Sequence, residues 1–399
     1  MKAFDDRNNK MEEYDVVIIG AGPAGAIAAK TCAEEGLKTL ILERKKIPRF
    51  KVCAGGISAG ALSELNFKIE EDLVERECYG ARVNYKDYQI ELKKRSKMAI
   101  MVSRDRFDAY LTSRAVEAGA NLHDSEKATT LHQKEKEIVV ETEKEEYRAK
   151  VVIGADGVNS TTSKYVRAPF KPEEVGLCIA ADIPAENEEV DSYIEGAVEF
   201  NFGIARMGYA WVFPKEKHFS VGIGGVSTAM KDSKVKFTEF LQKKGLNTDA
   251  TIRTYPLPRG GYEREVCSDR IILVGDAAGF VDPFLGEGIK YAFMSGKLAA
   301  KRILKSYEND DFSKTALNGY KKECHESFTE HLTYGLKLTR LMNRYPNIFF
   351  TLLAENEKVL DRGLEVVAGR IEYKEYLKWL IPRVPHYMLH TILPAWRNK

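Results

Sequence analysis

A glycine-rich turn between two apolar runs, at residues 15–44, constrains the fold of this chain more than any other feature. The run Asp15 to Ile19 suits a buried parallel strand, GAGPAG follows it as a tight turn, and residues 26–35 suit a helix of small side chains. A second apolar run covers residues 38–42. The order strand, helix, strand predicts a parallel α/β sheet.

The three glycines of this turn have different expected tasks. Gly20 permits the turn, Gly22 lets the backbone approach a pyrophosphate, and Gly25 lets the helix pack closely on the strand. An anion would lie at the helix N-terminus, and Glu43, at the end of the second strand, could accept hydrogen bonds from a ribose. We therefore expect a Rossmann-like dinucleotide site, the alternative being a turn that only packs a helix.

Size and composition narrow the class of protein. The 399 residues, 44% of them hydrophobic, predict two or three domains, and a net charge of +2 gives no reason to expect a nucleic-acid partner. The six cysteines are too widely spaced for a local zinc or iron–sulfur motif, so no metal is expected and a reducing compartment is the simpler interpretation. Neither a signal sequence nor an apolar run of membrane-spanning length is visible. We expect a cytoplasmic protein, with peripheral contact to the inner face of a membrane as the alternative.

Two further segments contain candidate ligand-binding groups of uncertain role. The irregular loop at 47–58 carries Cys53, which is equally compatible with a site residue and with a small packing thiol. The helix predicted after Ser103, its expected N-cap, has Arg104 and Arg106 in its first turn, where the helix dipole disfavours cations. Either arginine could meet a ligand anion or remain on the solvated surface.

Apolar strands recur with a carboxylate at their ends. VVIGADG places Asp156 after one such strand, and IILVGDAAG places Asp276 after another. Ligands gather at strand ends of this kind in a doubly wound sheet. The glycines of GEG, Gly286 and Gly288, begin the helix predicted to run through residue 305, whose N-terminus could stabilise negative charge. Strands are also expected at 121–124, 138–142 and 147–153, as parts of a meander.

A second sheet is predicted at residues 177–226, where the hydrophobic pattern has period two. Tyr209, Trp211 and Phe213 alternate in this region, so their rings should share one face. That face is either an ordinary sheet core or an aromatic wall for an apolar substrate. Beyond residue 311 we expect amphipathic helices, and the segment 379–389 is expected to cover the domain core, with membrane contact as its alternative.

Three segments together, GAGPAG with Glu43, GADG, and GDAAGFVDPFLGEG, resemble the FAD-binding signatures of glutathione-reductase-like flavoproteins of the p-hydroxybenzoate-hydroxylase branch. In that branch an aspartate such as Asp276 contacts the ribityl chain and an arginine such as Arg104 contacts the flavin; the geranylgeranyl reductases, which the chain also resembles as described below, carry a cysteine–glycine loop such as 51–56 beside the flavin. The resemblance implies an FAD site made of Gly20, Gly22, Ala24, Gly25, Glu43, Arg44, Cys53, Ala54, Arg104, Asp156, Gly275, Asp276, Gly286, Gly288 and Ile289.

A narrower resemblance is to the geranylgeranyl reductases. It rests on the spacing of Tyr209-x-Trp211-x-Phe213-Pro214 and Gly222-x-Gly224. Archaeal members of that family saturate the isoprenoid chains of ether lipids, so these six residues are implied to bind an isoprenoid lipid or prenyl diphosphate. The chain shows no second glycine fingerprint, so the electron donor could be NAD(P)H or a protein such as ferredoxin.

The expected organisation is an α/β fold in which a mixed β-sheet domain interrupts the FAD-binding domain and a helical region follows both. Three pieces are expected to form the FAD-binding domain: residues 11–79, 103–172 and 263–310. The substrate domain is expected to comprise residues 80–102 and 173–262, and the C-terminal helical region residues 311–399.

The chemistry of an isolated C=C bond suggests which residues act. Hydride addition alone would give an unstabilised carbanion, so hydride and proton must be delivered together. We expect Tyr209 and Trp211 to stabilise positive charge on the protonated side, and Cys53 or an ordered water to supply the proton. The alternative functions are a flavin monooxygenase on the same scaffold and a prenyl-binding escort protein without redox activity.

Overall fold

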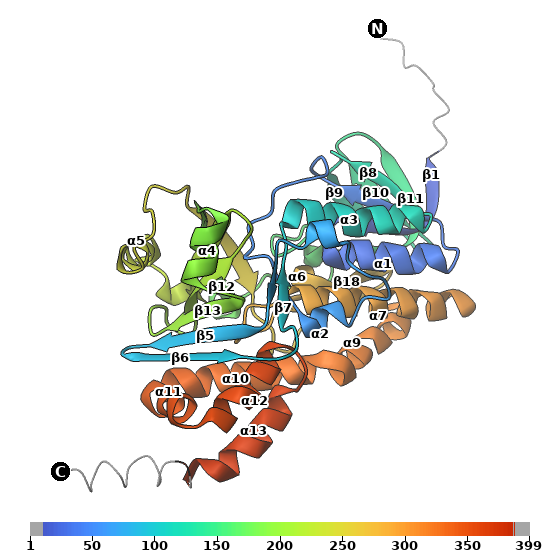
Figure 1. Ribbon diagram of the computed structural model, residues 1–399. Coiled ribbons are helices and arrows are strands. Elements are labelled where there is room, and N and C mark those ends of the chain that lie inside the picture. Colours follow the sequence, from blue (N-terminus) through green and yellow to red (C-terminus); the bar gives the residue numbers. More distant parts are fainter. Residues whose placement is uncertain (1–10, 386, 388–399) are drawn as a thin grey trace, which may run out of the picture.

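In the computed structural model, which describes residues 11–385 and residue 387, two large β-sheets lie side by side and helices cover both (Figure 1). The first sheet has eight strands: β17 (Cys267–Ser268), β18 (Ile271–Leu273), β11 (Glu146–Gly154), β1 (Glu12–Ile19), β2 (Thr39–Glu43) and β8 (Asn121–Asp124) in that order, with β10 (Ile138–Thr142) pairing both β11 and β9 (Ala128–Gln133). The strand β1 pairs in parallel with β2 and β11. The carboxyl ends of these strands therefore meet at one edge.

Helix α1 (Pro23–Glu34) follows the glycine turn and packs between α3 (Arg104–Glu117) and α7 (Ile289–Glu308). Its small side chains let α7 come close: a Cβ on Gly296 would lie 2.5 Å from the carbonyl oxygen of Ala24. The predicted Rossmann-like unit is confirmed, and the small residues are explained by helix packing.

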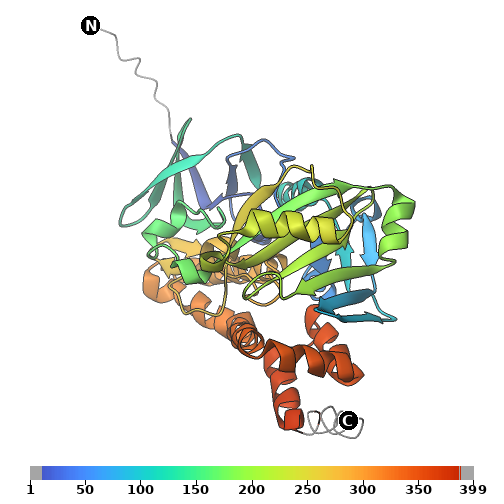
Figure 2. The same cartoon turned by 90° about the vertical axis from the view of Figure 1, so that its left-hand side faces the viewer.

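The second sheet has seven strands in the order β16 (Arg253–Pro258), β12 (Val175–Pro184), β15 (His218–Val226), β14 (Tyr209–Pro214), β13 (Ala197–Phe202), β5 (Gly80–Tyr85) and β6 (Tyr88–Lys93). Its strands are antiparallel except for the pair β13 and β5. Helices α4 (Asn187–Tyr193) and α5 (Ser233–Lys243) cover one face, as the view in Figure 2 also shows.

The other face of this sheet packs against four C-terminal helices, drawn in orange and red in Figure 1: α10 (Glu330–Arg344), α11 (Pro346–Glu355), α12 (Glu357–Val367) and α13 (Tyr373–Leu380). The preceding short helices, α8 (Lys314–Leu317) and α9 (Gly319–Cys324), pack against α7 instead. Phe350 of α11 stacks on Tyr85 of β5 with ring centroids 4.1 Å apart. None of the helices in the described part of the chain is long and apolar enough to cross a membrane. In the segment 379–389, residues 386, 388 and 389 lie outside the described part.

A small third sheet joins the two large ones, and it differs from expectation. It contains β3 (Gly56–Ser58), β7 (Ala99–Met101) and β4 (Arg76–Cys78). Residues 99–101 therefore pair with β3 and β4 and not with the seven-stranded sheet, to which we had assigned them. The short helix α2 (Ala59–Leu62) follows β3, and α6 (Gly275–Ala278) follows β18.

Two local expectations are also corrected. The strand β8 is not part of the meander but pairs in parallel with β2, because the chain returns to the edge of the main sheet after α3. Ser103 does hold the N-cap position of α3, yet its hydroxyl makes no capping bond and donates to Glu75 instead.

Candidate cofactor and substrate site

A large cavity lies where the two sheets meet. Its wall is formed by the turn between β1 and α1, the loop after β2, the start of α6 and the segment before α7 on one side, and by β14 and β15 on the other. Segments far apart in the sequence thus surround one space.

In the glycine turn, two of the three glycines are in close contact with neighbouring backbone, and the third faces open space. Gly20 has φ +108°, and a Cβ there would lie 2.4 Å from the carbonyl oxygen of Ala155. A Cβ on Gly25 would lie 1.9 Å from the carbonyl oxygen of Gly20. A Cβ on Gly22, by contrast, would meet no atom closer than Arg49 Nη2 at 3.8 Å. The open side of Gly22, at the N-terminus of α1, is a cradle of the kind a phosphate group occupies.

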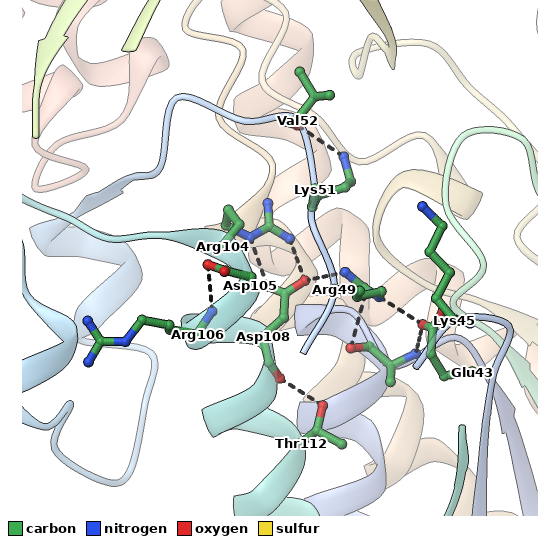
Figure 3. Close-up of polar contacts among 11 residues, drawn as sticks. Glu43, Lys45, Arg49, Lys51, Val52, Arg104, Asp105, Arg106, Asp108 and Thr112 are labelled. Carbon is green, nitrogen blue, oxygen red and sulfur yellow. Dashed lines mark hydrogen bonds and ion pairs between the residues drawn. The ribbon is translucent and has the colours of Figure 1, made fainter. Parts of the chain in front are cut away.

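A chain of alternating charges runs beside this cradle (Figure 3). Arg49 Nε lies 3.2 Å from Glu43 Oε2, and Arg49 Nη1 lies 3.0 Å from Asp108 Oδ2. Asp108 also accepts two hydrogen bonds from Arg104, at 2.8 and 3.0 Å. Because all four side chains are mostly buried and paired, this series of ion pairs holds the loop after β2 against α3.

Arg104 is therefore not a solvated surface residue, whereas Arg106 is exposed and pairs with Asp72. The carboxylate of Glu43 accepts hydrogen bonds from the N–H groups of Ala21, at 3.1 Å, and Lys45, at 3.0 Å. Arg49 and Asp108 are further residues of this site that the sequence motifs do not identify. The helical spacing of Arg104 and Asp108 could have indicated the second, but no local signal marks Arg49.

Cys53 is exposed on the cavity wall, close to two cations. Although the residue is open to the cavity, desolvation by the surrounding protein atoms opposes ionisation of its thiol. Arg104 and Lys51 outweigh this effect and hold the pKa of Cys53 below its ordinary value. The N–H of Gly55 donates to Sγ at 3.4 Å. Burial, with a contribution from Arg104, lowers the pKa of Lys51 to about 8, and its ammonium lies 3.2 Å from the ring centre of Tyr255.

The two strand-end aspartates both line the cavity. Burial raises the pKa of Asp276. Asp156 Oδ2 accepts hydrogen bonds from the N–H groups of Thr161 and Thr162, at 2.7 and 3.0 Å, and so orders the loop after β11. Asp156 Oδ1 is buried and has no partner among the described residues, which is the kind of orphaned acceptor that a hydroxyl of a bound polyol can satisfy.

The segment before α7 closes one end of the cavity. Gly286 has φ +70°, Gly288 is the N-cap of α7, and Ile289 is its first residue. A Cβ on Gly288 would lie 3.3 Å from Asp276 Oδ1. The N-terminus of α7 and the carboxylate of α6 are thus adjacent. Four more predicted residues also line this cavity: Ala24, Arg44, Ala54 and Gly275.

The aromatic side chains of β14 form the opposite wall. Tyr209, Trp211 and Phe213 all line the cavity, while Ala210 and Val212 point into the core beneath α5. The Tyr209 hydroxyl donates to the carbonyl oxygen of Leu285 in the segment before α7. The predicted common face is therefore present, and it borders the expected flavin region.

Gly222 and Pro214 do not line this cavity, although we had assigned both to the substrate site. Trp211 lies opposite Gly222 in the sheet, and a Cβ on Gly222 would lie 2.2 Å from the indole ring. Gly222 thus makes room for the indole and acts on the cavity only through it. Gly224 does line the cavity. Gly25 of the glycine turn does not line it, and its close contact with the backbone of Gly20 is a packing contact.

Comparisons with known proteins agree with this geometry. The family model of the FAD binding domain matches residues 13–333. The digeranylgeranylglycerophospholipid reductase of Methanocaldococcus jannaschii is 30% identical over 390 residues, covering 93% of this chain and 96% of its own. An enzyme of the same name from Methanopyrus kandleri is 32% identical, covering 95% of this chain and 98% of its own.

Solved structures share the fold. A geranylgeranyl bacteriochlorophyll reductase-like protein from Thermoplasma acidophilum has a TM-score of 0.78 at 24% identity, covering 96% of this chain and 100% of its own. The flavin-dependent halogenase CmlS has a TM-score of 0.66 at 23% identity, covering 81% of this chain and 64% of its own. The match to the FAD binding domain and the sequence matches over nearly the whole chain establish both the cofactor, FAD, and the family: the chain belongs to the geranylgeranyl reductases, FAD-dependent oxidoreductases with the FAD binding domain.

Proposed function

We propose that this protein saturates C=C bonds in the geranylgeranyl chains of archaeal-type ether-lipid precursors. The observation that carries the proposal is the position of the aromatic wall: Tyr209, Trp211 and Phe213 line the same cavity as the FAD-binding segments. Relatives that match nearly the whole chain are named for the reduction of such lipids.

The residues that would hold FAD follow from the site. The open N-terminus of α1 at Gly22 suits the pyrophosphate, Glu43 the adenosine ribose, and Asp276 the ribityl chain. The N-terminus of α7 at Gly288 would lie against the flavin ring. When bound and reduced, FAD supplies a hydride, and the protein must orient the alkene, exclude water and provide the proton.

The aromatic wall suits the protonation of the alkene. A C=C bond without an electron-withdrawing group acquires tertiary cation character on the protonated side. The faces of Tyr209 and Trp211 could stabilise that charge by about 0.5–2 kcal/mol. Each buried CH₂ of a prenyl chain would add roughly 0.8 kcal/mol to binding. Phe200, whose ring centroid lies 5.3 Å from that of Tyr209, extends the apolar surface.

The proposal includes three further features. Cys53 lies beside the flavin, where the charges of Arg104 and Lys51 lower the pKa of its thiol. Electrons come from NAD(P)H or from a protein donor such as ferredoxin. The enzyme works in the cytoplasm or at the inner face of the membrane, where its lipid substrate resides.

The proposal is tested by anaerobic turnover. Protein loaded with FAD and reduced with dithionite is incubated with a diether lipid that carries geranylgeranyl chains, and the lipid is analysed by mass spectrometry. We expect a gain of two hydrogen atoms for each saturated bond, and no gain with oxidised protein. An unchanged lipid, or a product that gains oxygen only after air is admitted, would instead favour a monooxygenase.

A further inference from the structure

Glu287, between the two glycines of GEG, is an acid that the chemistry described so far does not use. It lines the cavity and sits one residue before the N-cap of α7. Its Oε1 accepts a hydrogen bond of 2.5 Å from the hydroxyl of Ser58. Among the described residues, no side chain pairs with Oε2 and no cation lies within ion-pair distance of Glu287. The second oxygen is therefore available to a bound molecule.

Glu287 is also next to the aromatic wall. The segment that carries it touches Tyr209 twice: the Tyr209 hydroxyl donates to the carbonyl oxygen of Leu285, and a Cβ on Gly286 would lie 3.6 Å from that hydroxyl oxygen. Through Ser58 the side chain reaches β3, which follows the loop of Cys53. Glu287 thus stands between the two parts of the site that a prenyl chain and a flavin would occupy.

The other acids on this wall are less suited to proton donation. Arg104 and Lys51 hold the pKa of Cys53 below its ordinary value, which favours the thiolate. Burial raises the pKa of Asp276, but the charges of Lys51 and Arg104 oppose that shift, and this carboxylate is assigned to the ribityl chain. Asp282 accepts hydrogen bonds from the N–H groups of Phe284 and Leu285 and from the Tyr373 hydroxyl, and these donors occupy both of its oxygens.

We propose that Glu287 is the acid that protonates the alkene. Saturation of one C=C bond takes up one proton and one hydride. The O–H bond of Glu287 would break and its proton would form a C–H bond at one alkene carbon, while FAD, when bound and reduced, would supply the hydride for the C–H bond at the other carbon and be left oxidised. Glu287 is left as a carboxylate and recovers a proton from solvent. This assignment rests on the proposed reduction of geranylgeranyl chains.

The electrostatics of the position support the role. Burial raises the pKa of Glu287 to about 7, and the charge of Asp282 acts in the same direction. The Ser58 hydrogen bond and the charge of Lys290 act in the opposite direction but do not outweigh burial. The neighbouring hydroxyls of Tyr209, Tyr291 and Tyr373 have raised pKa values and stay neutral. An acid with a pKa near neutrality can be protonated before reaction and reprotonated after it.

The test compares Glu287→Gln with the wild-type enzyme over a pH series. Turnover of the geranylgeranyl lipid by the wild-type enzyme should fall as pH rises through about 7, since only protonated Glu287 can donate. Glu287→Gln keeps the size of the side chain but has no proton to give. It should bind FAD normally, lose roughly 10²–10⁴-fold in turnover and lose the pH inflection. Glu326→Gln, an exposed acid on the surface, is the matched control and should behave like wild type.

A second variant covers the case in which Glu287→Gln does not fold. Ser58→Ala removes the hydrogen bond that lowers the pKa of Glu287, so the inflection should move up by roughly 0.5–1 pH unit. The infrared carbonyl band of a protonated carboxyl, measured without substrate, should titrate with the same inflection in wild type and be absent in Glu287→Gln. The Glu287 assignment is wrong if the wild-type enzyme and Glu287→Gln reduce the lipid at the same rate. It is also wrong if the inflection of the pH profile lies at the same pH in Ser58→Ala as in the wild-type enzyme. If the wild-type enzyme leaves the lipid unchanged, the proposed function itself fails.

Discussion

Gly22 and Gly25 lie three residues apart and should respond to substitution in opposite ways. A side chain at Gly22 enters open space beside α1, so Gly22→Val should fold but lose FAD, because the side chain fills the phosphate cradle. A methyl group at Gly25 meets backbone at 1.9 Å, so Gly25→Ala should lower stability by about 1–3 kcal/mol. Thermal melts of the cofactor-free proteins and flavin absorbance after incubation with FAD distinguish the two effects. If Gly22→Val does not fold, or if it binds FAD normally, Gly22 does not form a phosphate-binding cradle.

Cys53 should be the most reactive of the cysteines. The cations at Arg104 and Lys51 lower its pKa, whereas burial raises the pKa values of the other five, Cys32, Cys78, Cys178, Cys267 and Cys324. Since the thiolate is the nucleophile, iodoacetamide should modify Cys53 more than about tenfold faster than any other cysteine at neutral pH. Peptide mass spectrometry gives the site and rate, and added FAD should slow the modification. Earlier labelling of any buried cysteine would contradict this electrostatic picture.

The sequence predicted residues whose role depends on local pattern and missed those whose role depends on distant partners. The glycine turn and Glu43 were found because strand, turn and helix are contiguous. Arg49 was missed because its partners, Glu43 and Asp108, come from two other elements. Gly222 was assigned to substrate because it stands in a motif, whereas its function is to leave space for Trp211 on the neighbouring strand.

At the level of elements, β14 gives the aromatic wall its direction. Alternation along this strand sends Ala210 and Val212 to the core and the three aromatic rings to the cavity. Trp211→Ala should retain FAD and fold but lose roughly 2- to 30-fold in turnover of the prenyl lipid, equivalent to the loss of about 0.5–2 kcal/mol of charge stabilisation. Phe237→Leu, in α5 on the opposite face of the sheet from the cavity, is a control that should alter stability more than turnover. Equal loss of FAD in both variants would mean that Trp211 serves only packing.

The assignment of strands to sheets succeeded where the period-two pattern was long and failed where the strand was short. The residues of β12 to β15 alternate along several strands and were placed in one sheet. The three residues of β7 are too few to show a period, and their pairing with β3 and β4 depends on segments from both sides of the chain. Likewise the sequence pattern of β8 is similar to that of the meander strands that follow it, and only its parallel pairing with β2 distinguishes it from them.

For the molecule as a whole, function depends on bringing the two sheets together around one cavity. The composition and the order of elements predicted an interrupted FAD-binding domain followed by helices, but not that the C-terminal helices would pack on the substrate sheet through Phe350 and Tyr85. FAD bound at this junction should stabilise the folded state, because its site is assembled from segments that come together only in the folded chain. With FAD at 100 times its Kd the gain should be about 2.7 kcal/mol, seen as a higher Tm. An unchanged Tm with bound FAD would contradict a site that exists only in the folded protein.

The absorbance of the flavin shows whether an unactivated alkene accepts the electrons, as we propose. Protein whose FAD has been reduced is mixed with geranylgeranyl lipid in the strict absence of oxygen, and the absorbance of oxidised flavin is followed. We expect this absorbance to return in proportion to the C=C bonds saturated, and a fully saturated lipid to cause no change. Flavin that stays reduced with the unsaturated lipid and is oxidised only when oxygen is admitted would contradict the proposal.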